Sequence, residues 1–244
     1  MIRSLPFLLS ALALAGCITV VPPEAAPQPP VPLALPAVPA PQLQGPQDKL
    51  AAFAAVAADV EPVAETLCRH RAGPVNCDLV IAVDDRAGQP PNAFQTLDPR
   101  GRPYVVFTRS LIEMARTADE LAFVLGHEAA HHIAGHIPRR EYEARSGALV
   151  AAVIAQASGL SAQDVEIVQG LGAEVGARRF SRDFELEADS LGAEIALMAG
   201  YDPLRGSAFF DRLPDPGDQF LGTHPPNAER KAMVIETVRR LTGG

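Results

Sequence analysis

The sequence predicts a single α+β domain that is mostly α-helical and carries a small β-sheet near its beginning. The chain has 244 residues, of which 48% are apolar, and this is enough to bury one good core. Three short segments between residues 78 and 108 alternate like strands, and nearly everything after Arg109 has helical periodicity. Strands followed by a run of helices are typical of an α+β domain.

Residues 1–16 have the pattern of an export signal, in which Arg3 precedes an apolar run too short to span a bilayer. Leu14-Ala15-Gly16-Cys17 resembles the bacterial lipobox, where Cys17 would be lipidated and become the mature N-terminus. Ordinary signal cleavage and an uncleaved segment are the alternatives. Ile18 favours, by the same resemblance, release to the outer membrane. We therefore expect a periplasmic protein with a lipid anchor.

Residues 17–46 are rich in Pro and Ala and predict an extended, polyproline-like tether, so the folded domain would cover residues 47–244. Cys68 and Cys77 lie inside that domain. Because an exported protein sits in an oxidising compartment, we expect a disulfide between them, with two separate buried thiols as the alternative.

The elements follow from periodicity. A helical Ala/Val/Leu pattern covers Asp48 to Arg71, with Pro62 as a kink or a break. Strands are expected at Asp78–Asp84, Asn92–Leu97 and Tyr104–Thr108, and the turn residues 98–101 separate the last two. Breaks in the helical part are expected around Asp202, 214–217 and 224–226.

One helix carries a metal-binding pattern. Thr117 with Glu120 three residues later forms a capping box that starts a helix, and Gly135 and Pro138 mark its end. Inside it, His127-Glu128-Ala129-Ala130-His131 places two imidazoles four residues apart, on one face and at a spacing that suits tetrahedral zinc. Glu128 lies about 100° round the helix from His127, where it can reach a metal-bound water as a general base.

The remaining histidines of this segment are not expected to be ligands. His132 and His136 lie on other faces of the helix or at its end. A longer pattern with a third histidine also fails, because Ala134 stands where that pattern needs Gly and Ile137 where it needs His. The third ligand must come from elsewhere in the chain.

The best donor is a later acidic helix. Glu185, Ala188, Asp189 and Gly192 share one of its faces, and Glu187 points nearly opposite. Small residues between the carboxylates would let this helix approach the histidine helix closely. We therefore expect Glu185 as the third ligand and Asp189 as the acceptor for the outer N–H of a ligand histidine. An ordinary acidic solvent face is the alternative.

These motifs resemble the gluzincin family that contains the CAAX prenyl proteases, the HtpX-type membrane proteases and the periplasmic quality-control proteases. The resemblance is carried by Asn92-Ala93-Phe94, Asp119 to Ala122, Ser181-Arg182 with Glu185 to Asp189, and Thr223 to Pro226 with Arg230. It implies a zincin-like metalloprotease domain with one zinc ion on His127, His131 and Glu185, catalysis by Glu128, and substrate laid along an edge strand near Asn92 to Thr108. The short, lipoprotein-type periplasmic members are the most similar.

The resemblance also assigns roles to two residues near the C-terminus. His224 would belong to a loop that stabilises the oxyanion or occupies the open zinc position, and Arg230 would steady charge nearby. A structural histidine beside two prolines is the alternative for His224. Residues 147–176, the longest apolar stretch of the mature chain, predict a helical hairpin near the active cleft, with a membrane-surface role as the alternative.

The expected activity is hydrolysis of peptide bonds in misfolded or stalled cell-envelope proteins by a zinc-dependent endopeptidase. One alternative is a non-proteolytic chaperone or assembly factor for outer-membrane proteins that uses the same cleft, and another is a structural zinc domain. A nucleic-acid partner is not expected, because the formal charge is -8 and no run of Lys or Arg could neutralise phosphates.

Overall fold

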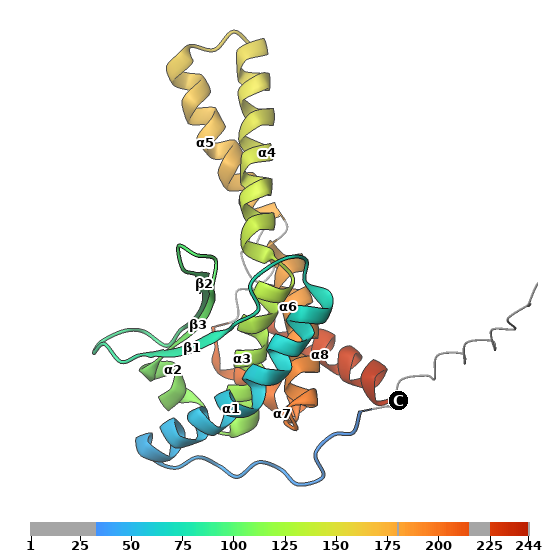
Figure 1. Cartoon of the computed structure of the whole chain (residues 1–244). Coiled ribbons are helices and arrows are strands. Elements are labelled where there is room, and N and C mark those ends of the chain that lie inside the picture. Colours follow the sequence, from blue (N-terminus) through green and yellow to red (C-terminus); the bar gives the residue numbers. More distant parts are fainter. Residues whose placement is uncertain (1–32, 180, 215–224, 244) are drawn as a thin grey trace, which may run out of the picture. The chain divides into compact units, whose positions relative to one another are not determined.

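The structure is a computed structural model that describes residues 33–179, 181–214 and 225–243. The described residues lie within one compact unit. Their helices and strands are α1 (Pro46–Arg71), β1 (Val80–Asp84), β2 (Ala93–Leu97), β3 (Pro103–Thr108), α2 (Arg109–Met114), α3 (Ala118–Ile133), α4 (His136–Ala157), α5 (Ala162–Arg179), α6 (Ser181–Met198), α7 (Pro203–Gly206), the 3₁₀ helix η1 (Ser207–Arg212) and α8 (Asn227–Thr242) (Figure 1). The predicted α+β class, mostly α with a small sheet, is confirmed.

The sheet has three strands in the order β1-β3-β2. β1 runs parallel to β3, with Ile81 opposite Val105, and β2 runs antiparallel to β3, with Gln95 opposite the same Val105. The turn between β2 and β3 closes at Gly101, whose φ of 78° is easy for glycine because it has no Cβ. β2 is therefore an edge strand, and within the described residues its outer side pairs with no other strand.

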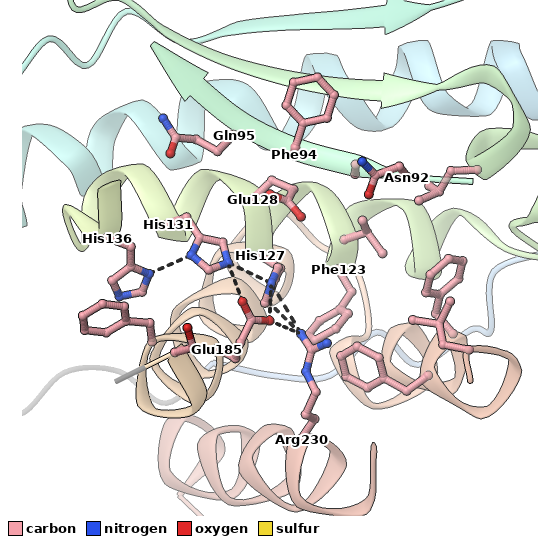
Figure 2. Close-up of a pocket in the computed structure, with 18 of the residues that line it drawn as sticks. Asn92, Phe94, Gln95, Phe123, His127, Glu128, His131, His136, Glu185 and Arg230 are labelled. Carbon is pink, nitrogen blue, oxygen red and sulfur yellow. Dashed lines mark hydrogen bonds and ion pairs between the residues drawn. The ribbon is translucent and has the colours of Figure 1, made fainter. Parts of the chain in front are cut away.

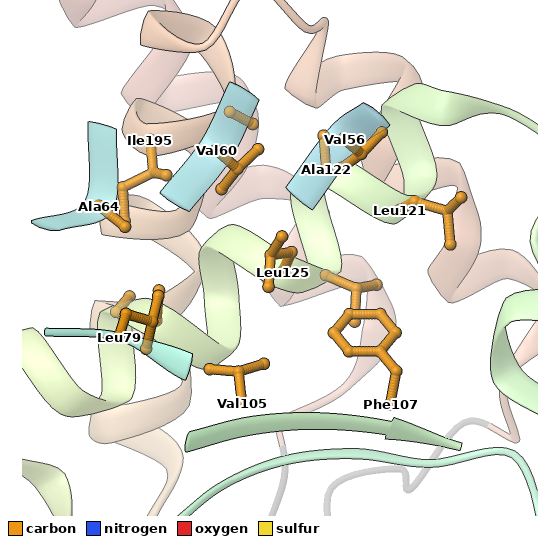
Figure 3. Packing of buried hydrophobic residues seen from close by; sticks show 14 of the residues in the cluster. Val56, Val60, Ala64, Leu79, Val105, Phe107, Leu121, Ala122, Leu125 and Ile195 are labelled. Atoms are coloured by element: carbon orange, nitrogen blue, oxygen red, sulfur yellow. The ribbon is translucent and has the colours of Figure 1, made fainter. Parts of the chain in front are cut away.

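The core lies between α1, α3 and the sheet. Val56 and Val60 of α1, Leu121 and Leu125 of α3, and Phe107 of β3 are all fully buried in one apolar cluster (Figure 3). Burial of these side chains is the main stabilising contribution of the domain. It also holds α3 by its apolar face, which leaves another face of α3 for polar side chains.

α1 continues past the proline at which a kink or a break was expected. The helix continues through Pro62 to Arg71, so the expected break is absent. Pro62 is exposed, and the Thr66 hydroxyl donates to the Pro62 carbonyl at 2.7 Å. At its end Cys68 forms the expected disulfide with Cys77, with their Cα atoms 5.7 Å apart. The bond ties the end of α1 to the segment that leads into β1.

Part of the segment expected to be a tether contacts the domain. The Leu33 amide donates to the carbonyl of Leu241 at 3.0 Å, and the Leu43 amide donates to that of Arg116 at 2.8 Å. Gln42 also forms an isolated antiparallel bridge with Thr117. Residues 33–45 form no helix, and at these points they contact the body of the domain.

α4 and α5 form the hairpin expected over residues 147–176 (Figure 1). Their backbones touch at glycines: a Cβ added to Gly147 would lie 2.2 Å from the carbonyl oxygen of Gly172. The large apolar side chains point outward and are at least half exposed at Leu149, Val150, Val153, Ile154, Ile167 and Leu171. In the described part of the chain, neither these helices nor any other is both long and apolar enough to cross a membrane.

Candidate metal site

The histidine helix α3 is fixed at both ends. The Thr117 hydroxyl caps its N-terminus by accepting from the Glu120 amide at 3.3 Å, and the Glu120 carboxylate accepts from the Arg116 amide at 2.7 Å. At the other end Gly135 adopts a left-handed conformation, with φ 66°, and separates α3 from α4. The predicted start after Thr117 and the predicted end at Gly135 are confirmed. Pro138 lies in the first turn of α4, where proline is tolerated.

Two glycines let α6 cross α3 closely. A Cβ added to Gly126 would lie 2.7 Å from the Gly192 carbonyl oxygen, and one added to Gly192 would lie 2.6 Å from the His127 nitrogen. No real Cβ contact is that short, so both positions need glycine for the crossing to exist. The crossing brings the carboxylate of Glu185 on α6 beside the imidazoles of α3 (Figure 2).

Three donor groups converge at this crossing. The Nε2 atoms of His127 and His131 lie 3.1 Å apart, and they lie 3.5 Å from Oε2 and Oε1 of Glu185, respectively. Donors bound at about 2.0–2.1 Å to a tetrahedral metal lie about 3.3 Å from one another. The set therefore fits a metal ion, and these three residues could hold one.

Asp189 supports the first imidazole from behind. Its Oδ1 lies 2.9 Å from His127 Nδ1, on the opposite side of the ring from the ligand nitrogen. The Asp189 side chain is fully buried, and its two oxygens also accept from Nε and Nη2 of Arg230 at 2.7 and 2.6 Å. Because Asp189 holds the proton on Nδ1, the Nε2 lone pair of His127 faces the metal position.

Arg230 comes from α8 and is buried between the acidic groups and an aromatic ring. Besides Asp189, its Nη2 lies 3.5 Å from Glu185 Oε2, and its guanidinium lies 4.0 Å from the centre of the Phe210 ring. Burial lowers the pKa of Arg230, but Asp189 and the neighbouring glutamates outweigh burial and raise it, so the side chain stays charged. It balances part of the negative charge of the two α6 carboxylates.

The two histidines of the candidate site differ in charge when no metal is bound. Burial lowers the pKa of His127, but hydrogen bonds with Asp189 and Glu185 overcome burial and raise it to about 10. Burial and the charge of His127 lower the pKa of His131 to about 2. At neutral pH the metal-free His127 therefore carries a proton on each ring nitrogen, and a metal must displace the one on Nε2, whereas His131 is already neutral.

Glu128 lies on the neighbouring face of α3 and points toward β2 (Figure 2). Burial is the largest influence on its carboxyl group and raises the pKa, while the charge of His127 and a backbone hydrogen bond from Gln95 lower it. The net direction is upward from the usual range. A raised pKa suits a group that must take a proton and give it back.

The site opens into a cavity of about 550 Å³. Its walls are the edge strand β2 with the residues just before it (Pro91 to Gln95), the donors of α3 and α6, and Arg230 of α8. Ile137 and Arg140 at the base of the α4–α5 hairpin also line the cavity. Within the described residues, the only part of α4 and α5 that lines the cavity precedes residue 147, so the expectation that residues 147–176 pack near the cleft is wrong.

The sequence did not predict the contacts that His136 and Glu187 make near the site. Nδ1 of His136, which was not expected to be a ligand, lies 2.7 Å from Nδ1 of His131. Its Nε2 lies 3.2 Å from Oε2 of Glu187. Glu187 does point away from Glu185, as the helical periodicity predicts, but that direction leads to the first turn of α4. The histidine five residues after His131 was the only signal in the sequence. His132 instead bonds the Asn76 carbonyl at 2.7 Å, away from the donor set.

Two residues named from the sequence fall outside the described residues: Cys17, expected to be lipidated, and His224, expected near the open metal position. Their roles remain predictions.

Comparison with known proteins agrees with this geometry. The model of peptidase family M48 matches residues 54–238, most of the chain. The chain is 30% identical over 152 residues to the mitochondrial metalloendopeptidase OMA1 of Schizosaccharomyces pombe, covering 60% of this chain and 43% of that protein. It is 30% identical over 142 residues to the protein of the same name in Arabidopsis thaliana, covering 57% and 28%.

A bacterial relative also matches. A putative β-barrel assembly-enhancing protease of Vibrio cholerae is 32% identical over 122 residues, which cover 46% of this chain and 25% of the relative. The matched region is less than half the length of each of these curated relatives.

Proposed function

The chain belongs to peptidase family M48, and from this premise we propose that it is a zinc metalloendopeptidase. We propose that its substrates are misfolded or stalled cell-envelope proteins, whose peptide bonds it hydrolyses. One observation carries the proposal. Two imidazole nitrogens and a carboxylate converge at 3.1 to 3.5 Å beside the half-buried Glu128, in a cavity bordered by an edge strand.

His127, His131 and Glu185 would hold zinc, which suits two nitrogen ligands and one oxygen ligand with the fourth position open. Bound zinc supplies Lewis acidity, which polarises the scissile carbonyl and makes the attacking water more acidic. Asp189 keeps His127 turned toward the metal position, and Arg230 keeps Asp189 in place. These residues set the geometry before substrate arrives.

Glu128 acts as the general base. Its carboxylate takes a proton from the attacking water and passes that proton to the leaving amide nitrogen, so the peptide bond breaks as the new C–O bond forms. The burial that raises the Glu128 pKa brings its proton affinity closer to that of water near the metal. The resemblance of the sequence makes His224 a candidate donor to the oxyanion.

Substrate would bind as a strand along β2. Residues 91–95 line the cavity, and β2 is the edge of the sheet. Backbone hydrogen bonds to an edge strand do not depend on side chains, so they suit extended, unfolded polypeptides of varied sequence. Folded proteins cannot offer such a segment, which favours misfolded or stalled substrates.

The envelope location rests on the N-terminal signal and on one relative. Residues 1–17 have the pattern of a bacterial lipoprotein signal, and the relative from Vibrio cholerae is named for β-barrel assembly. We propose a periplasmic enzyme that Cys17 anchors to the outer membrane. In fractionated cells, Cys17→Ser should move the protein from the outer membrane to the soluble periplasm, and a variant that stays in the membrane would count against the anchor.

A proteolytic role and an assembly role can be separated. The name of the Vibrio cholerae relative favours a second candidate, a chaperone for outer-membrane proteins that uses the same cleft without cleavage. If this is the function, Glu128→Gln should still promote assembly of an unfolded β-barrel protein while it cleaves nothing, and wild type should not degrade that protein.

The decisive experiment measures zinc content and casein digestion of the full chain, with and without a chelator. Glu128→Gln should retain one zinc and lose cleavage by at least about 100-fold, because it removes the base and leaves the ligands. Glu141→Gln, an exposed glutamate on α4 paired with Arg145, serves as the matched control and should cleave like wild type. A Glu128→Gln protein that digests casein at the wild-type rate would refute the assignment.

A further inference from the structure

The second ligand histidine is held by another histidine. His131 faces the donor set with Nε2, which lies 3.1 Å from Nε2 of His127 and 3.5 Å from Oε1 of Glu185. Its Nδ1 lies 2.7 Å from Nδ1 of His136, at the start of α4 (Figure 2). His127 differs, because its outer nitrogen meets the carboxylate of Asp189, a group that can only accept.

Proton accounting fixes the direction of this histidine pair. A neutral imidazole has one N–H and one lone pair, and His131 must present the lone pair of Nε2 to a metal. Its proton is therefore on Nδ1, which donates to His136. His136 Nδ1 must then accept, so the proton of His136 is on Nε2.

Glu187 selects that form of His136. Its Oε2 lies 3.2 Å from His136 Nε2 and accepts the proton there. The same oxygen accepts from Nη1 of Arg139 at 2.7 Å, which holds the carboxylate in place. The result is a directed series of hydrogen bonds from His131 through His136 to Glu187, in which every group has a suitable partner.

Packing holds the series rigid. His136 is only 5% exposed and stacks on Phe184, with ring centres 4.6 Å apart and planes 12° from parallel. The guanidinium of Arg139 lies 4.3 Å from the centre of the same ring. Phe184 directly precedes Glu185 on α6, so the ring that supports His136 is adjacent in sequence to the third donor. The arrangement thus couples α4 to both helices of the site.

We propose that His136 is a positioning residue which, held by Glu187 and Arg139, fixes His131 as the tautomer with its proton on Nδ1 and its Nε2 directed at the metal. His136 does not touch substrate or metal. The inference rests on the proposed zinc function and adds to it the residue that orients one of the ligands. Outer partners of this kind typically change metal affinity 10- to 100-fold.

The test compares two substitutions of His136 in the full chain. His136→Leu removes the acceptor, whereas in His136→Asn the side-chain oxygen takes the place of Nδ1 and can still accept from His131. Zinc affinity, measured by competition with a chromogenic chelator, should fall about 10- to 100-fold in His136→Leu. His136→Asn should recover most of that loss. Equal losses in the two variants would indicate a packing role and would overturn the proposal.

His132→Leu is the matched control, because His132 lies beside His131 on α3. His132 also loses one hydrogen bond, to the carbonyl of Asn76, but it lies away from the donor set. Its zinc affinity should stay within about threefold of wild type, since no ligand loses a partner. A loss as large as that of His136→Leu would mean that any histidine removed here weakens the site, and it would overturn the proposal.

Two further measurements decide the matter if both His136 variants fail to fold. Glu187→Ala changes a half-exposed side chain and should weaken zinc binding in the same direction but less than His136→Leu. Nitrogen-15 NMR of the zinc-loaded wild type should show His131 protonated at Nδ1 and His136 protonated at Nε2. Unchanged affinity in Glu187→Ala together with the other tautomer of His136 would overturn the assignment.

The outcomes also separate this inference from the proposed function. A wild-type protein that binds no zinc would refute both. A wild type that binds zinc and cleaves casein, but whose zinc affinity does not respond to His136→Leu, would refute only the role of His136.

Discussion

Gly192 of α6 lies directly against the backbone of His127 of α3, so that a Cβ at Gly192 would be 2.6 Å from the His127 nitrogen. Gly192→Ala should therefore push the two helices apart, destabilise the protein by about 1–3 kcal/mol through overpacking and weaken zinc binding by moving Glu185. Urea unfolding of the metal-free protein and chelator competition would measure the two effects.

Gly170→Ala is the control for that substitution. Gly170 is exposed on α5, and a Cβ there meets nothing within 4 Å. Because alanine is the better helix former, this variant should be unchanged or stabilised by up to about 1 kcal/mol. If Gly192→Ala behaves like Gly170→Ala, the close crossing of α3 and α6 is not what positions the site.

Removing one partner of the buried Asp189–Arg230 ion pair should cost far more stability than removing one partner of an ion pair at the surface. Asp189→Ala leaves Arg230 buried without its main partner and should cost about 3–5 kcal/mol of unfolding free energy in the metal-free protein. Glu141→Ala removes the exposed i,i+4 pair with Arg145 and should cost no more than about 0.5 kcal/mol. Chemical denaturation of both variants would test this, and similar losses would contradict it.

Zinc binding should release a proton at neutral pH. The pKa of His127 is raised to about 10 in the metal-free site, so its proton must leave when zinc binds, whereas His131, whose pKa is lowered to about 2, is already neutral. Apparent zinc affinity should therefore rise about tenfold per pH unit between neutrality and the His127 pKa. Calorimetry in buffers of different ionisation enthalpy would count the proton, and none released at pH 7.5 would contradict the shift.

The raised pKa of His127 also affects folding: as pH rises, the metal-free protein should lose stability while its zinc affinity increases. Because the folded-state pKa of His127 lies above its unfolded value of 6.5, the metal-free protein gains stability from the charged imidazole. That contribution is complete below the unfolded pKa and is lost as pH rises through about 10.

The Cys68–Cys77 disulfide should stabilise the start of the domain. It closes a short loop with a sequence separation of 9, and such loops contribute about 2–3 kcal/mol by restricting the unfolded chain. The double variant Cys68→Ala with Cys77→Ala should unfold at lower urea than wild type. Reductant should lower the wild-type midpoint to nearly the same value and leave the double variant unchanged; a reductant effect of equal size in both would argue against the bond.

Much of the fold followed from local patterns. The three strands and the capped helix that begins after Thr117 lie within a few residues of their expected bounds, and the expected hairpin forms but begins earlier, at His136. Pro62 is the main exception. Its pattern indicated a kink or a break, but the residue is exposed, and the packing of Val60 and Ala64 on either side keeps α1 continuous.

What the sequence by itself determined is the geometry inside single elements: the imidazoles of His127 and His131 share a face, and Glu128 stands beside it, because residues four apart recur at one side of a helix. Only the tertiary structure decided what meets that face. Glu185 reaches it because Gly126 and Gly192 allow the helices to touch, and His136 and Glu187 join it because the first turn of α4, which follows the left-handed Gly135, lies beside α6. Periodicity sets directions within a helix, whereas distances between helices depend on how closely their backbones can pack.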